Sequence, residues 1–254
     1  MIVALTNSNL YSNNFSNDWK EFREDYHQLF RNVSNTKLKD LAAPSAIVLS
    51  SLLAAQFDEE VRNIFKSIDD NNFNQFQIVA NQLGEPISFC VFPGLVYGSG
   101  HIFNSKAMRR TGWLMYESVL LNGLITGILK TTLGRARPYV ESGNSRFEHF
   151  TYKDDNFMSM PSGHTSMVFA MATILSYRSR STLLSIIYYA MAGSTGMARI
   201  YFDKHWFSDI IAGAMIGTAS SLLIINAEKS RKNNIETTEI PIIQFNITID
   251  KIKF

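Results

Sequence analysis

The stretch Pro161-Ser162-Gly163-His164 stands where a polar loop gives way to an apolar run over residues 167–177. Proline and glycine in a short turn, with serine and threonine beside them, are typical of a helix start. A helix start leaves backbone N–H groups without partners and carries partial positive charge, so it suits an anion. A histidine there can bind a phosphate oxygen or move a proton onto it. Taken alone, the tetrapeptide is more typical of an ordinary turn.

Composition indicates one large domain or two small ones, without a nucleic-acid function. The chain has 254 residues, a net charge of +2 and 46% hydrophobic residues. A charge so close to neutral provides no electrostatic attraction for nucleic acid, so we expect no nucleic-acid partner. Cys90 is the only cysteine of the sequence, so no internal disulfide can form. Because it lies in an apolar stretch, we expect a buried, inert thiol.

The apolar residues gather in six segments. A membrane-spanning helix needs about 20 apolar residues, with a range of about 17–25. The second, third and sixth segments reach this length. The first, fourth and fifth are at its lower end and are also compatible with buried helices of a soluble bundle. The segments cover residues 41–56, 86–104, 112–133, 163–178, 182–198 and 208–226.

Basic residues mark the amino-terminal stretch and every second connection after it. If all six segments cross a membrane, these stretches lie on one side, which the positive-inside rule predicts to be the cytoplasm. Both termini are then cytoplasmic, connections 57–85, 134–162 and 199–207 lie on the far side, and we expect a bacterial inner membrane. A soluble bundle has no physical reason to sort its charges this way. The basic residues are Lys37, Lys39, Lys106, Arg109, Arg110, Arg178, Arg180, Lys229, Arg231 and Lys232.

The two ends differ from this core, so we divide the chain into a polar segment 1–40, a core 41–227 and a tail 228–254. Residues 1–15 are polar and are predicted to be disordered. Residues 17–33 show the apolar spacing of an amphipathic helix, which either packs on the protein or lies on a membrane surface. The tail alternates apolar and polar residues from 239 to 254, which is typical of a strand.

Three residues inside the apolar segments stand out, two glycines and one ionisable residue. Gly213 and Gly217 are spaced to let a neighbouring helix approach closely. Glu117 is an ionisable group at possible membrane depth. It is either functional, or a structural residue that is paired or reaches the interface.

Three cations stand at the predicted far-side ends of the segments. Lys130 and Arg137 follow the third segment, and Arg199 follows the fifth. Each alone is compatible with an interfacial anchor. Together they can neutralise the phosphoryl oxygens that carry the charge in a phosphoryl-transfer transition state. No cluster of Asp, Glu or His has metal-ligand spacing, and three cations make a metal unnecessary, so we expect neither metal nor cofactor.

Two histidines can flank the same phosphorus atom. Asp209 follows His205 by four residues, and a carboxylate so placed can hold the Nδ1–H of the histidine and leave Nε2 free to attack. This assigns His205 as nucleophile and Asp209 as its orienting group. His164, beside the anion at the helix start, is left as the general acid.

The three stretches, in this order, resemble the signature motifs of the type 2 phosphatidic acid phosphatase (PAP2) and vanadium haloperoxidase superfamily. That pattern is Lys, six residues, Arg-Pro; then Pro-Ser-Gly-His; then Ser-Arg, five residues, His, three residues, Asp. The chain matches every fixed position except Ala198, which stands where the family has serine, so one hydroxyl near the phosphate is missing. The resemblance covers residues 40–226.

The resemblance implies a membrane lipid phosphatase of all-α fold, a six-helix transmembrane bundle with its site at the outer face. His205 would form a phosphohistidine, and His164 would protonate the leaving alkoxide and then activate water. The phosphate-binding residues that it implies are Lys130, Arg137, Ser162, Gly163 and Arg199.

Two other functions remain open from sequence. One is a soluble or periplasmic acid phosphatase, or a vanadate-dependent haloperoxidase, of the same superfamily; a signal peptide and disulfides would favour the phosphatase. The other is a non-catalytic membrane scaffold, against which the intact His164, His205 and Asp209 argue. A lipid phosphate and the bilayer are the expected partners. Neither the lipid nor the oligomeric state can be inferred from the sequence.

Overall fold

The computed structural model describes residues 2–34 and 42–233, and its regular structure there is helical apart from one isolated bridge between Arg135 and Phe147. This confirms the all-α prediction for the described part of the chain. Each of the six predicted apolar segments falls in a helix, whereas the strand predicted in the tail lies outside the described residues. The helices are α1 (Ile2–Ser34), α2 (Ala42–Ala55), α3 (Asp58–Lys66), α4 (Asn71–Leu83), α5 (Pro86–Ile102), α6 (Lys106–Leu133), α7 (Gly163–Ser179), α8 (Thr182–Tyr201) and α9 (Phe207–Asn233).

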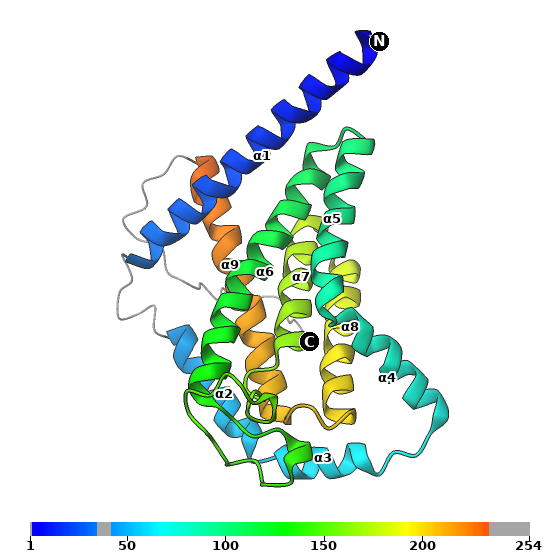
Figure 1. Ribbon diagram of the computed structural model, residues 1–254, viewed down its shortest axis with the longest axis vertical. Coiled ribbons are helices and arrows are strands. Elements are labelled where there is room, and N and C mark those ends of the chain that lie inside the picture. Colours follow the sequence, from blue (N-terminus) through cyan, green and yellow to red (C-terminus); the bar gives the residue numbers. More distant parts are fainter. Residues whose placement is uncertain (1, 35–41, 234–254) are drawn as a thin grey trace, which may run out of the picture.

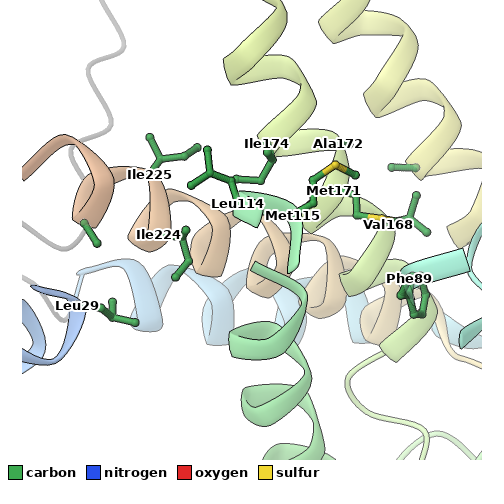
Figure 2. Close-up of a cluster of buried hydrophobic side chains, with 12 residues drawn as sticks. Leu29, Phe89, Leu114, Met115, Val168, Met171, Ala172, Ile174, Ile224 and Ile225 are labelled. Carbon is green, nitrogen blue, oxygen red and sulfur yellow. The ribbon is translucent and has the colours of Figure 1, made fainter. Parts of the chain in front are cut away.

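Helix α7 is the centre of the bundle. It packs against α6, α8 and α9, and these helices run side by side with α5 along the long axis of the molecule (Figure 1). Buried apolar side chains of α6, α7 and α9 form the core, with Leu29 of α1 and Phe89 of α5 at its edges (Figure 2). Leu114 and Ile224 are fully buried in it. Helix α1 crosses one end of the bundle, while α3 and the 134–162 loop lie at the other (Figure 1).

Two glycines of α9 bring this helix against the start of α7. A Cβ atom at Gly217 would lie 2.0 Å from the carbonyl oxygen of Ser166, and one at Gly213 would lie 2.6 Å from that of Ser162. Only glycine therefore fits at either position. The predicted close approach of a neighbouring helix is confirmed, and it fixes α9 directly beside the tetrapeptide 161–164.

Large apolar side chains are exposed along the outer faces of the bundle. Two of the described helices, Lys106–Leu133 and Phe207–Lys232, are long and apolar enough to cross a membrane. Exposed apolar surface of this extent is typical of contact with lipid or protein and supports a membrane protein. The count of six spanning helices stays a prediction. Exposed residues include Val48, Leu52, Val91, Leu95, Leu120, Leu124, Ile128, Leu183 and Ile186.

The end of the bundle covered by α1 holds a buried ionic network around Arg110 of α6. Its guanidinium binds Asp25 of α1, Glu117 at 2.7 Å and Glu228 of α9 at 3.0 Å. Arg231 of α9 adds a second ion pair to Asp25, at 2.6 Å. Glu117 is thus a paired structural carboxylate. Helix α1 packs on the protein through these charges, and its Trp19 and Phe22 contact Trp113 of α6.

Three predictions differ from the structure. The helix α1 begins at Ile2, so residues 2–15 are helical rather than disordered, because extending an existing helix costs little. Cys90 is exposed rather than buried, because α5 is apolar on its outer face as well. The connection 57–85 contains the helices α3 and α4. The division at residues 40 and 227 stays a prediction, and α9 itself continues to Asn233.

Candidate active site

Four helix ends meet where the three motifs lie: the ends of α6 and α8 and the starts of α7 and α9. Gly134 ends α6 in a left-handed conformation, with φ of 61°, and its amide donates to the carbonyl of Lys130 at 2.9 Å. A side chain there would collide with the Glu148 carbonyl. This turn sends the chain directly from Lys130 into the loop that carries Arg135 and Arg137.

The tetrapeptide forms the first turn of α7, as its sequence indicates. Ser162 is the N-cap residue, fully buried, and its Oγ accepts from the Thr165 amide at 3.4 Å. Its own amide donates to the Asp209 carbonyl at 3.0 Å, which joins the second and third motifs. A Cβ at Gly163 would lie 3.5 Å from Cε of Lys130, so the lysine side chain extends along this turn.

Lys130 and Arg137 are held by backbone carbonyls that fix their positions. The ammonium group of Lys130 donates to the carbonyl of Met158 at 2.5 Å and to that of Ser159 at 3.3 Å. Arg137 donates to the carbonyl of Asp155 at 2.8 Å and to its carboxylate at 2.6 Å. Because carbonyl groups leave the lysine charge uncompensated, an anion would be attracted to it.

Arg199 keeps one donor without a partner. Its Nη1 donates to the side-chain oxygen of Asn81 at 2.6 Å, and the residue is only 8% exposed. Its Nε is buried and has no hydrogen-bond partner among the described residues. A buried donor without a partner is costly, and a bound phosphate oxygen would satisfy it.

Asp209 lies beneath His205 and is itself held by several donors. Its oxygens accept hydrogen bonds from Arg135 at 2.7 Å, from Ser159 at 2.5 Å and from the Trp206 amide at 2.9 Å. One oxygen lies 3.7 Å from Nδ1 of His205, which is longer than a hydrogen bond. The predicted orienting contact is therefore an ion-pair distance in this structure, and the roles of both residues stay predictions.

The ring of His205 is electrostatically set to be neutral. Burial lowers the pKa of His205 well below its usual range, and the charges of Lys130 and Arg137 lower it further against the opposing effect of Asp209. The residue is 2% exposed. A neutral imidazole at neutral pH is the form that a nucleophile requires.

His164 lies in the same electrostatic environment as the cations. Lys130 and Arg199 both act on it, and Lys130 also acts on His205, so the two histidines share one charged site. The His164 side chain is 24% exposed, and its Nε2 lies 3.7 Å from a carboxylate oxygen of Glu85 at the start of α5.

Sequence reasoning missed the residues that assemble the third motif. Arg135 bridges Asp209 and Asp58 at 2.7 and 2.6 Å, and Asp58 accepts from the Ser208 amide at 2.8 Å. The ring of Trp206 is buried, and the guanidinium groups of Arg62 and Arg135 both lie over it, at 5.4 and 5.7 Å from its centroid. The position of Arg135 inside the first motif could have indicated a role in the site. Nothing in the sequence, however, indicates that it pairs with Asp58.

Among the described residues, no three side chains of His, Cys, Asp or Glu are grouped as a metal site. Asn81 and Glu85, which touch Arg199 and His164, were also missed. They come from the connection 57–85, which the sequence motifs do not include. All three predicted far-side connections therefore supply residues around this site.

Residues 111–232 match the family model described as the PAP2 superfamily. The lipid A 1-phosphatase of Porphyromonas gingivalis is 34% identical over 125 residues, which cover 47% of this chain and 24% of that protein. The lipid A 1-phosphatase of Rhizobium johnstonii is 35% identical over 117 residues, which cover 44% and 46%. The chain thus spans between a quarter and a half of the length of these relatives.

Two solved structures share the fold. LpxE of Aquifex aeolicus aligns with a TM-score of 0.53 and 22% identity, covering 67% of this chain and 95% of that one. The transmembrane PAP2 type phosphatidylglycerolphosphate phosphatase of Bacillus subtilis aligns with a TM-score of 0.56 and 19% identity, covering 77% and 98%. At these identities the likeness concerns the fold.

Proposed function

We propose, from the premise that residues 111–232 belong to the PAP2 superfamily, that this protein is a membrane phosphatase acting on a lipid phosphomonoester or pyrophosphate. One observation carries the proposal. A buried neutral histidine, a second histidine and three cations meet at one end of a helical bundle whose sides expose apolar residues. Such a site can receive a phosphate headgroup while the lipid tails stay in the bilayer.

The reaction proceeds in two steps on these side chains. Nε2 of His205 attacks phosphorus, the bond from phosphorus to the lipid oxygen breaks, and His164 gives its proton to that oxygen. His164 then takes a proton from water, whose oxygen attacks the phosphohistidine and releases phosphate and His205. Lys130, Arg137 and Arg199 neutralise the phosphoryl oxygens in both steps, with Ser162 and the Gly163 amide beside them.

The placement in the membrane follows from charge. Six helices, α2 and α5 to α9, cross the bilayer, with the ionic network of Arg110 and both termini in the cytoplasm. The site then faces the extracytoplasmic side of a bacterial inner membrane. Two contacts of basic residues support this: Arg178 at the end of α7 donates to Thr111 near the start of α6 at 3.1 Å, and Arg110 of α6 pairs with Glu228 of α9 at 3.0 Å. The basic ends of α6, α7 and α9 thus lie together.

An apolar cleft supports a lipid substrate. It has a volume of about 470 Å³ and lies between α5, α7 and α8, and its lining includes Leu83, Ile87, Leu95 and Leu175. Leu83 and Ile87 flank Glu85, the neighbour of His164. A headgroup at the histidines would therefore place an acyl chain in this cleft.

The test is phosphate release by the purified, detergent-solubilised protein. The substrates are phosphatidic acid, phosphatidylglycerol phosphate, undecaprenyl pyrophosphate, lipid A and a soluble phosphomonoester, each with and without EDTA. We expect turnover of at least one lipid, unchanged by EDTA. Turnover of the soluble ester alone would instead favour a soluble-type acid phosphatase, and loss restored by magnesium would refute metal independence.

The His205→Ala variant tests the nucleophile. We expect phosphate release to fall by about a thousandfold or more, since a group that forms the covalent bond has no substitute. Circular dichroism and the elution volume in detergent report whether the variant remains folded. Retained turnover by a folded variant would exclude His205 as nucleophile.

A further inference from the structure

The corner between α4 and α5, residues 81–85, packs on the catalytic residues although it lies outside the segment matched to the superfamily. Gly84 is at the centre of the corner. A Cβ there would lie 2.9 Å from Cβ of His164 and 2.7 Å from Cγ2 of Thr195. The hydroxyl of Thr195 donates to the carbonyl of Ala80 at 2.9 Å and fixes α4 to α8. The corner is therefore held directly against His164.

Asn81 connects a phosphate-binding cation to an acidic residue. Its side-chain oxygen accepts from Nη1 of Arg199 at 2.6 Å, and its amide nitrogen donates to a carboxylate oxygen of Glu85 at 2.9 Å. The two hydrogen bonds use both ends of the Asn81 amide group. They hold Arg199 and Glu85 in a fixed relation on either side of the corner.

Glu85 is the carboxylate that faces His164. Its Oε1, the same oxygen that Asn81 holds, lies 3.7 Å from Nε2 of His164. Burial of the ring disfavours its protonated form most, and the other charged groups that act on it, Arg199 from α8 and Lys130 from α6, act in the same sense. A nearby carboxylate opposes them and stabilises the imidazolium. Among the charged groups that act on His164, Glu85 is thus the one that favours its protonated form.

We propose that Glu85, positioned by Asn81, favours the protonated form of His164 and so supports this residue as the general acid of the reaction. The inference rests on the proposed function. Glu85 is a positioning residue, because it acts through His164 and not on the substrate. The ring nitrogen that does not face Glu85 is left to give its proton to the lipid oxygen. We expect the distance of 3.7 Å to shorten to a hydrogen bond when the ring is charged.

The experiment compares the full-length protein in detergent with its Glu85→Gln variant by kcat/KM between pH 5 and 9. The substrates are short-chain phosphatidic acid, whose alkoxide must be protonated as it leaves, and p-nitrophenyl phosphate, whose phenolate leaves unaided. For phosphatidic acid, the alkaline limb of the variant should move to lower pH by about 0.5 to 1 unit, since Glu85 is partly exposed. For p-nitrophenyl phosphate, the two profiles should coincide.

Three further variants make the result specific. Glu85→Asp keeps the charge and should restore most of the shift. Glu60→Gln removes an exposed carboxylate of α3 and should leave both profiles unchanged. Gly84→Ala pushes the corner away from His164 and should reproduce the shift of Glu85→Gln.

The outcomes separate this inference from the function on which it rests. A wild-type protein that hydrolyses no lipid of the panel named above refutes the proposed function itself, and a lipid of that panel that is turned over replaces phosphatidic acid here if phosphatidic acid is not. An active wild type whose phosphatidic acid profile coincides with that of Glu85→Gln overturns the role of Glu85 alone. A shift of equal size with both substrates overturns it as well, because the residue would then not act through the leaving group.

Discussion

At the scale of single residues, burial decides which charge state each catalytic group can hold. His205 is 2% exposed, lies next to Trp206 and faces two cations, so its neutral form is favoured. Its neighbour Asp209 is fully buried and accepts hydrogen bonds from three donors. Burial on folding keeps the ring of His205 neutral, so a nitrogen lone pair is available for attack on phosphorus.

This burial makes stability depend on pH. The pKa of His205 is lowered by folding, whereas a histidine in the unfolded chain has a pKa of about 6.5. Below that pH the unfolded state takes up a proton that the folded state does not bind. The free energy of unfolding should therefore fall with decreasing pH, with a contribution from His205 of about 1.4 kcal/mol per unit below pH 6.5.

Thermal unfolding in detergent between pH 7.5 and 5 measures this effect. His205→Gln should show a shallower loss of Tm than the wild type, because its side chain does not titrate. His27→Gln, at an exposed position on α1, serves as the matched control. Equal slopes for His205→Gln and the wild type would contradict the expectation.

At the scale of elements, opposite ends of the same helices serve different purposes. The ends of α6 and α8 and the starts of α7 and α9 form the site, whereas the start of α6 and the end of α9 bind α1 through buried charges. Arg110 is surrounded there by Asp25, Glu117 and Glu228. Its role is to hold the helices, and no catalytic residue touches it.

Arg110→Leu should therefore destabilise the protein strongly. Three buried carboxylates would lose their common cation, which costs about 3–5 kcal/mol for a broken buried pair. Lys106→Leu is the matched control, because that lysine is exposed and its pair with Glu21 is worth less than about 1 kcal/mol. Unfolding midpoints of the two variants give the comparison, and a similar loss in both would show that the network is not stabilising.

The cleft between α5, α7 and α8 makes a prediction at the same scale. Val91→Trp should fill it and lower kcat/KM for a long-chain lipid phosphate about tenfold, with little effect on p-nitrophenyl phosphate. Leu52→Trp is the control, because Leu52 lines a second cleft of about 450 Å³ that borders α2 and α9. Phosphate release with both substrates measures the effect. If Leu52→Trp alone were impaired, the acyl chain would belong in the second cleft.

At the scale of the whole molecule, the basic helix ends and the candidate active site lie at opposite ends of the bundle. The cationic ends of α6, α7 and α9 lie beside α1, and the site lies beside α3 and α4. Exposed apolar side chains lie between these two ends, so the arrangement predicts one orientation in a membrane. The basic end should face the cytoplasm and the site the outside.

Cysteine labelling tests that orientation. The native Cys90 is first replaced by alanine, and a single cysteine is placed at Phe103 near the basic end or at Tyr152 near the site. These side chains are similarly exposed, at 70% and 68%. A membrane-impermeant maleimide applied to intact cells, after opening of the outer membrane, should label Tyr152→Cys alone. Labelling of Phe103→Cys alone would reverse the orientation.

The sequence alone was enough to predict the six apolar helices and the motif residues, but not α3, α4 or the first half of α1. An apolar segment as long as 112–133 exceeds the usual length of a strand and is predicted to be a helix, and the tetrapeptide 161–164 marks a helix start through its own turn chemistry. Both follow from contacts within a few residues of one another. For the same reason, the sequence predicted that a helix packs closely at Gly213 and Gly217, but not which helix this is.

Which distant residues meet depends on the packing of the helices and could not be read from the sequence. The pairs of Arg135 with Asp58 and of Arg199 with Asn81 join residues 77 and 118 positions apart. Nothing local distinguishes such residues from other polar side chains in a connection. Exposure of Cys90 was likewise undetermined, because an apolar helix can face protein or lipid equally well. The composition of the site beyond its motifs, Glu85 included, is set by how the helices pack, since side chains that lie far apart in sequence acquire neighbours only through the fold.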